Sequence, residues 1–105
     1  MASTKEYLEF IMDQLSALDD ISYRAMMGEY IIYYRGKIIG GIYDNRFLIK
    51  ITPSAKKLMP DAHFELPYKG GKKMLLVTDV DSKSFLSELL NAVANEIPLP
   101  KKKNK

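Results

Sequence analysis

Few residues in this chain of 105 could carry catalytic or metal chemistry. The sequence has no cysteine, which excludes disulfides, thiolate zinc sites and a cysteine nucleophile. It has a single histidine, His63, through which any Ser-His-Asp triad or histidine-based metal site would have to pass. The residue counts therefore limit the possible catalytic and metal chemistry of the protein before any helix or strand is assigned.

The strongest metal candidate is an alternating run around that histidine. Asp61, His63 and Glu65 would share one face of an extended strand, and two carboxylates with an imidazole can bind a divalent cation. Three ligands from one strand with no fourth candidate rarely close a site. We therefore interpret the run as a polar strand face between Pro60 and Pro67, and we expect neither a metal nor a cofactor.

Three other groups have structural explanations that we prefer to chemical ones. Asp79 and Asp81 precede a predicted helix, where carboxylates cap N–H groups and compensate the helix dipole. The segment 69–73, Lys-Gly-Gly-Lys-Lys, could hold a phosphate, but it lacks P-loop spacing and a following helix, so we favour a solvated hairpin. Gly40 and Gly41 lie within a predicted strand, where we prefer a packed helix or a bulge to a bound ligand as the explanation.

The charge of the chain lies mostly in its last residues. The net charge is +3, from 16 basic and 13 acidic residues. Four of the basic residues are Lys101, Lys102, Lys103 and Lys105, which leaves 12 basic against 13 acidic residues elsewhere. The near-neutral body argues against a surface that follows nucleic-acid phosphates. We expect residues 101–105 to form a disordered tail whose contact with nucleic acid is at most weak and accessory.

The remaining sequence is typical of one globular domain. Apolar residues make up 47% of the chain and charged residues 28%, and we assign residues 1–100 to a single domain. No apolar run approaches the roughly 18 residues that a membrane span requires. The first residues lack the basic flank and apolar stretch of a signal peptide, so we expect no membrane contact and a cytoplasmic location.

The elements that must position these residues can be predicted from periodicity. Residues 4–18 have the spacing of an amphipathic helix, with Ser3 and Glu6 as a capping box. Residues 23–51 are rich in β-forming residues and predict a three-stranded antiparallel meander, with turns at Gly36–Lys37 and Asp44–Asn45.

The second half predicts a short helix at 54–59 and strands at 64–66 and 74–78. A wide apolar stripe predicts a last helix after 82, with Asp81 or Ser82 as its cap and Pro98 at its end. We therefore predict an α+β fold: an antiparallel sheet with the N- and C-terminal helices on one face.

The strand from Tyr30 to Tyr34 is apolar on both faces. Two long helices can cover only one face of the sheet, so we expect a homodimer through the other face, with Tyr34 among the outward tyrosines. The competing prediction covers that face with the middle helix and residues 60–67, which gives a monomer. Nearby Arg24 is either exposed or paired with an acidic neighbour, since an unpaired buried guanidinium is costly. Its candidate partners are Asp19, Asp20 and Glu29.

A run of motifs resembles the N-terminal domain of the TfoX family, also called Sxy. It begins with Arg24-Ala25-Met26-Met27-Gly28-Glu29-Tyr30, continues through Tyr33, Tyr34, Gly36-Lys37 and Lys50, and ends at Pro67-Tyr68. The resemblance covers about residues 7–95, nearly the whole chain.

The resemblance implies an α+β fold in the order α-β-β-β-α-β-β-α, like that of type III secretion chaperones, which often pair as homodimers. It implies likeness to regulators of natural DNA transformation, which act with a cyclic-AMP-responsive transcription activator and carry a second, C-terminal helical domain. We expect a stand-alone version of the N-terminal domain that is not an enzyme and acts by protein–protein contact, with transcription machinery as a candidate partner. The family offers no catalytic residue to carry over. The candidate interaction residues are Arg24, Met26, Met27, Gly28, Tyr30, Tyr34, Gly36, Lys50 and Tyr68.

Two alternatives remain open at this point. One is an uncharacterised enzyme or small-ligand binder with a cleft near Arg24, Lys50 and Tyr68. The other is accessory DNA binding through the lysine tail, although the sequence has no helix-turn-helix pattern.

Overall fold

The structure is a computed structural model and describes residues 3–97, so the tail predicted at 101–105 lies outside the described residues. Within them it confirms the predicted α+β fold and antiparallel sheet. The elements are α1 (Lys5–Gln14), β1 (Ile21–Met26), β2 (Glu29–Tyr34), β3 (Lys37–Tyr43), β4 (Arg46–Ile49), α2 (Pro53–Leu58), β5 (Phe64–Glu65), β6 (Met74–Leu76) and α3 (Lys83–Glu96).

The sheet has the strand order β1-β2-β3-β4-β6-β5, and every neighbouring pair is antiparallel. The meander has four strands rather than three, because the segment before Gly28 pairs as β1. Two-residue turns at Met27–Gly28, Arg35–Gly36 and Asp44–Asn45 join the four strands, and all six turn residues have positive φ. Positive φ at both positions defines the hairpin turn whose twist matches that of the strands. The turn at Asp44–Asn45 is confirmed, and the one predicted at Gly36–Lys37 lies one residue earlier.

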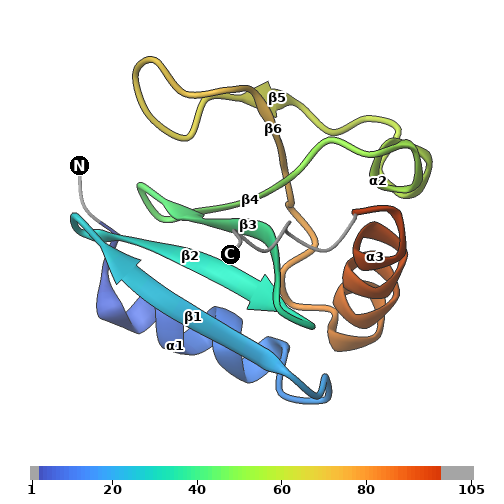
Figure 1. Cartoon of the computed structure of the whole chain (residues 1–105), viewed down its shortest axis with the longest axis horizontal. Helices are drawn as coiled ribbons and strands as arrows, with labels where there is room; N and C mark the ends of the chain where they lie inside the picture. Colours follow the sequence, from blue (N-terminus) through green and yellow to red (C-terminus); the bar gives the residue numbers. More distant parts are fainter. Residues whose placement is uncertain (1–2, 98–105) are drawn as a thin grey trace, which may run out of the picture.

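The two terminal helices pack on one face of the sheet, as predicted (Figure 1). Leu8, Ile11 and Leu15 around α1 and the apolar side of α3 share a single core with alternate residues of the strands. One cross-strand row of that core contains Ile32, Gly40, Ile49 and Leu75. The neighbouring row, from Arg24 through Ile31, Gly41 and Leu48 to Leu76, points to the opposite face, which we call the open face.

The start of α1 differs from the prediction. Thr4, not Ser3, is the N-cap, and its hydroxyl accepts a hydrogen bond from the Tyr7 N–H at 3.2 Å. The Ser3 backbone N–H and hydroxyl instead donate to one carboxylate oxygen of Glu29, at 3.1 and 2.6 Å. The same oxygen accepts a hydrogen bond from the Asp44 N–H at 3.1 Å, so Glu29 links the segment before α1 to the β3–β4 turn.

The prediction that Tyr34 points outward is wrong. Its ring is only 5% exposed on the helix face, and its hydroxyl donates to the Asn91 side-chain oxygen in α3 at 2.8 Å. The twofold period of the strand sends Tyr30, Ile32 and Tyr34 to the core together and leaves Ile31 and Tyr33 on the open face. A charge at Tyr34 would therefore disrupt the core of a single subunit.

The middle helix does not cover the open face either. The helix α2 contacts α3, and Glu96 at the end of α3 accepts hydrogen bonds from the Ser54 N–H and hydroxyl at 3.0 and 2.7 Å. These bonds lower the pKa of the Glu96 carboxyl. Their contribution to stability is therefore present above the usual glutamate range and is lost on acidification.

The two glycines of β3 mark a close approach between strands. A Cβ at Gly40 would lie 2.1 Å from the carbonyl oxygen of Leu48 and 2.7 Å from the Cα of Ile49, which are backbone atoms of β4. A register shift beside Ile32 and Tyr33 occurs on the other side of β3, where it pairs with β2, so the bulge considered from the sequence is present. The glycines are explained by packing of the sheet against itself.

We predict that Gly40→Ala destabilises the protein by about 1–3 kcal/mol, because the β4 backbone must move to admit the methyl group. Chemical denaturation of wild type and variant measures the difference. Ser22→Ala on exposed β1 is the control and should be within about 0.5 kcal/mol of wild type. Equal stability of Gly40→Ala and Ser22→Ala would contradict the close approach.

Candidate functional site

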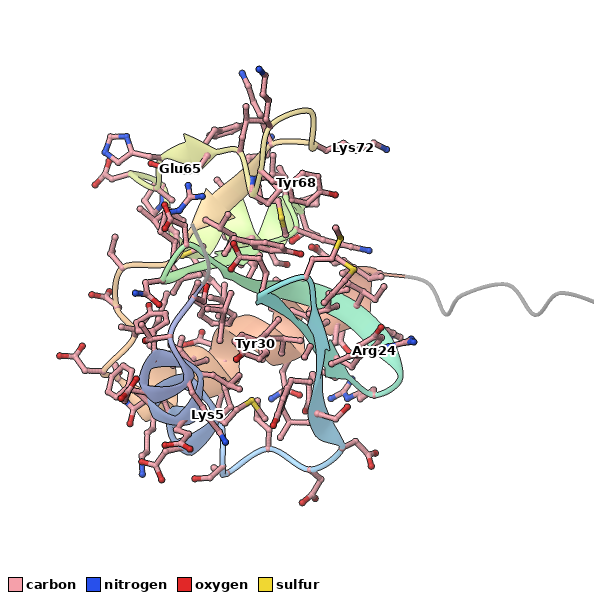
Figure 2. All side chains as sticks on the ribbon, turned by 90° about the vertical axis from the view of Figure 1, so that its left-hand side faces the viewer. Lys5, Arg24, Tyr30, Glu65, Tyr68 and Lys72 are labelled. Carbon is pink, nitrogen blue, oxygen red and sulfur yellow. The ribbon has the colours of Figure 1, made fainter. Side chains whose placement is uncertain are left out.

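The candidate interaction residues separate into two places on the open face and a set inside the fold. Arg24, Met26, Met27 and Gly28 lie together at the end of β1 and its turn into β2, which we call the β1 corner. Lys50 and Tyr68 lie around a cavity farther along the same face. Figure 2 shows Arg24, Tyr68 and Lys72 on the side of the molecule away from α1.

The β1 corner is exposed along its whole length. Every residue from Ser22 to Gly28 is exposed, including 39% of Met26 and 95% of Met27. The ion pairs among residues 3–97 are Arg46–Glu65 and Lys83–Asp13, so Arg24 is exposed rather than paired.

The Met27 side chain is held in solvent by strained backbone. Its φ of +52° is a conformation that favours glycine or asparagine and costs an apolar side chain free energy. The equivalent residue of the next turn, Arg35, also has positive φ, but its guanidinium lies 4.9 Å from the Tyr34 ring centre and donates to Asn91 and Asn95. Those contacts with the fold offset the strain at Arg35, whereas Met27 projects into water.

The remaining candidates do not join either place. Tyr30 is half-buried on the helix side, where its ring meets Tyr23 edge-to-face at 5.8 Å, and Tyr34 is in the core. Gly36 turns the chain at the other end of β2 from Gly28. These three residues shape the fold.

The cavity lies between the open face and the β5–β6 connection. Figure 1 shows this connection as a long loop on the same side of the molecule as the β3–β4 hairpin. Its volume is about 700 Å³. Lys50 and Tyr68 both line it, while Arg24 does not. Its lining residues are Ile38, Gly40, Tyr43, Lys50, Ile51, Pro67, Tyr68, Gly70, Gly71, Lys72, Lys73 and Met74.

Tyr43 is the cavity residue that sequence reasoning missed. It is the last residue of β3 and looks like an ordinary strand residue, so only the long-range return of the β5–β6 connection reveals it. Its ring is 7% exposed and lies 6.0 Å, centre to centre, from that of Tyr68. Burial, reinforced by Tyr68, Glu29 and Tyr33, raises the pKa of the Tyr43 phenol.

The expectation that Asp61, His63 and Glu65 share a strand face is wrong. The strand β5 begins only at Phe64, so Asp61 and His63 belong to the preceding loop. There they line a second cavity of about 270 Å³ together with Asp79. Glu65 instead binds Arg46, with the guanidinium Nη1 2.7 Å from the carboxylate Oε1.

Two absences apply to residues 3–97. No three of their His, Asp or Glu side chains come together as a group that could hold a metal ion. No helix among them is long and apolar enough to cross a membrane.

Residues 13–87 match the family described as the TfoX N-terminal domain. The chain therefore belongs to the TfoX N-terminal domain family. The matched range includes the β1 corner and the cavity, so both lie within this TfoX domain.

One relative of the TfoX domain is a protein of Spirochaeta aurantia described as an uncharacterized 12.7 kDa protein in the trpE 5′ region. It is 30% identical over 102 residues, which cover 96% of this chain and 89% of the relative. The description names no activity. No solved structure matches the chain, so the expected likeness to type III secretion chaperones stays a prediction.

The raised pKa of Tyr43 predicts a loss of stability at alkaline pH. The phenol stays neutral in the fold above the ordinary value of 10.0, whereas it ionises there in the unfolded chain. This contribution is complete below pH 10.0 and is lost as the pH rises toward the folded pKa. Denaturation between neutral pH and pH 11 measures the loss, which should be smaller in Tyr43→Phe.

Ultraviolet titration supplies a second readout, because the chain has seven tyrosines and no tryptophan. Tyr43→Phe should remove a late-titrating phenol. Tyr23→Phe on β1 is the control and should leave the alkaline loss of stability as in wild type. If Tyr43→Phe and Tyr23→Phe behave alike, the account of the Tyr43 environment is wrong.

Proposed function

We propose that this TfoX domain is a non-enzymatic regulatory domain that acts by protein–protein contact through the β1 corner. The observation that carries the proposal is Met27, 95% exposed on backbone of positive φ. Strained, exposed positions recur at functional sites, and methionine suits adaptable binding surfaces. The location of the domain in the cytoplasm belongs to the same proposal.

The chemistry of the corner indicates the kind of partner. Two thioether side chains, Met26 and Met27, lie beside the guanidinium of Arg24, which has no carboxylate partner in residues 3–97. Methionine and arginine are both enriched at protein interfaces. A partner surface with an apolar centre and an acidic rim would complement this corner, and a component of the transcription machinery is the partner that family membership favours.

The test compares corner variants with a matched variant on the helix side. The double variant Arg24→Glu/Met27→Glu should fold like wild type, since both side chains are exposed. Phe10→Glu on α1 alters a side chain that is 39% exposed on the opposite side. Each protein is used to capture partners from the native cell. Captured proteins that bind wild type and Phe10→Glu, but not the corner variant, are purified. Calorimetry then measures their binding to wild type and to both variants.

The corner variant should bind such a purified partner at least about tenfold more weakly than wild type, while Phe10→Glu binds normally. If the two variants bind equally well, or if no retained protein binds in purified form, the corner is not the contact surface.

A homodimer remains a separate proposal. The open face offers Ile31 and Tyr33, both half-buried, and Ile38, 38% exposed, whereas Tyr34 lies in the core. Light scattering at micromolar concentration should give twice the chain mass of 12.0 kDa, and Ile38→Asp should reduce it to one chain. A wild-type mass of 12.0 kDa would exclude the dimer under those conditions.

A second candidate function is binding of a small ligand. The observation in its favour is the cavity beside Lys50 and Tyr68, whose volume of about 700 Å³ falls within the range of small-molecule sites.

A further inference from the structure

The cavity is built from three separate parts of the chain. The strand β3 supplies Ile38, Gly40 and Tyr43, and the segment after β4 supplies Lys50 and Ile51. The β5–β6 connection and the first residue of β6 supply the rest, from Pro67 to Met74. The connection can fold over because Gly70 has a φ of +86°. At Gly71 even a Cβ would lie 3.0 Å from the Pro67 and Tyr68 side chains. The glycine pair in the 69–73 segment thus shapes the wall of a cavity.

The charges around the cavity are of one sign. Lys50, Lys72 and Lys73 line it, and none of the lining residues is acidic. Neither ion pair in residues 3–97 involves these lysines. Lys50 comes from the sheet side and the other two from the connection, so cationic residues border the cavity on two sides. Such a cavity attracts an anion in a domain body whose overall charge is near neutral.

The rest of the lining is apolar and aromatic. Ile38, Ile51 and Met74 contribute aliphatic surface, and Tyr43 and Tyr68 contribute rings. Tyr43 is nearly buried, whereas Tyr68 is 55% exposed and its ring can receive a second planar group. A simple inorganic ion would use the lysines and leave this surface in water. A ligand with both an acid group and a ring would use both parts.

We propose that the cavity binds a small ring compound that carries a phosphate group, with the phosphate at Lys50, Lys72 and Lys73 and the ring against Tyr68. The inference rests on the second candidate function and is independent of the β1 corner, whose Arg24 and Met27 do not line the cavity. It gives the Lys-Gly-Gly-Lys-Lys segment, which the protein-contact proposal leaves unused, a role in ligand binding.

The test uses three probes that separate the two halves of the ligand: adenosine 5′-monophosphate, adenosine and inorganic phosphate. Calorimetry and amide chemical shifts measure binding to the full chain at low salt. The monophosphate should bind at least about tenfold more tightly than either other probe and shift the amides of residues 67–74. Its affinity should fall as salt is raised, because exposed lysines are screened.

Lysine-to-methionine variants remove the charge and keep the length of the side chain, and they serve both as the test and as its control. Lys50→Met/Lys72→Met should weaken the monophosphate at least about tenfold, and Tyr68→Ala should weaken it while leaving inorganic phosphate unchanged. Lys56→Met/Lys57→Met on α2 removes two exposed charges that do not line the cavity and should bind like wild type.

The outcomes distinguish failure of the inferred phosphate recognition from failure of the ligand-binding candidate on which it rests. If adenosine binds as tightly as the monophosphate, the cavity is a ligand site but the inferred phosphate recognition is wrong. If Lys56→Met/Lys57→Met weakens the monophosphate as much as the cavity variant does, the attraction is nonspecific and the inference fails. If no probe binds saturably, both the inference and the ligand-binding candidate are overturned.

Discussion

The constraint on which this structure depends is that its two long helices can bury only one face of a six-stranded sheet. Both pack on the side of Ile32, Ile49 and Leu75 and form one core with them. The other face is therefore covered to different extents along the sheet. The β5–β6 connection borders a cavity together with residues of β3 and of the segment after β4, and Leu48 of β4 is fully buried. Over β1 no segment of residues 3–97 returns, and the strand is left exposed.

That division explains why the two candidate sites differ in character. At the β5–β6 connection, residues from distant segments border an open cavity, which suits a small molecule. On β1, which no other segment of residues 3–97 covers, Arg24, Met26 and Met27 form an exposed corner, which suits another macromolecule. Membership of the TfoX N-terminal domain family covers both places and does not by itself choose between them.

Local pattern was enough to predict most elements, because turns and amphipathic periods are properties of neighbouring residues. The Asp44–Asn45 turn and the Ser82 cap are examples. Faces were harder. In a strand of β-forming residues such as Tyr30 to Tyr34, composition alone does not say which alternate set is inward, and the hydrogen bond from Tyr34 to Asn91 in α3 decides it. The cavity could be predicted only in part, because Tyr43 and Lys72 line it together only after the β5–β6 connection returns to the sheet, and that return leaves no short-range signal in the sequence.

The central claim is that this domain works through the open side of its sheet at the β1 corner. It is tested most directly by placing a photoreactive amino acid in the native cell, at the position of Met27 in one strain and of Phe10 in another. The account predicts that light attaches a defined partner protein at the Met27 position and not at the Phe10 position. Attachment at Phe10 alone, or to the same proteins from both positions, would contradict it.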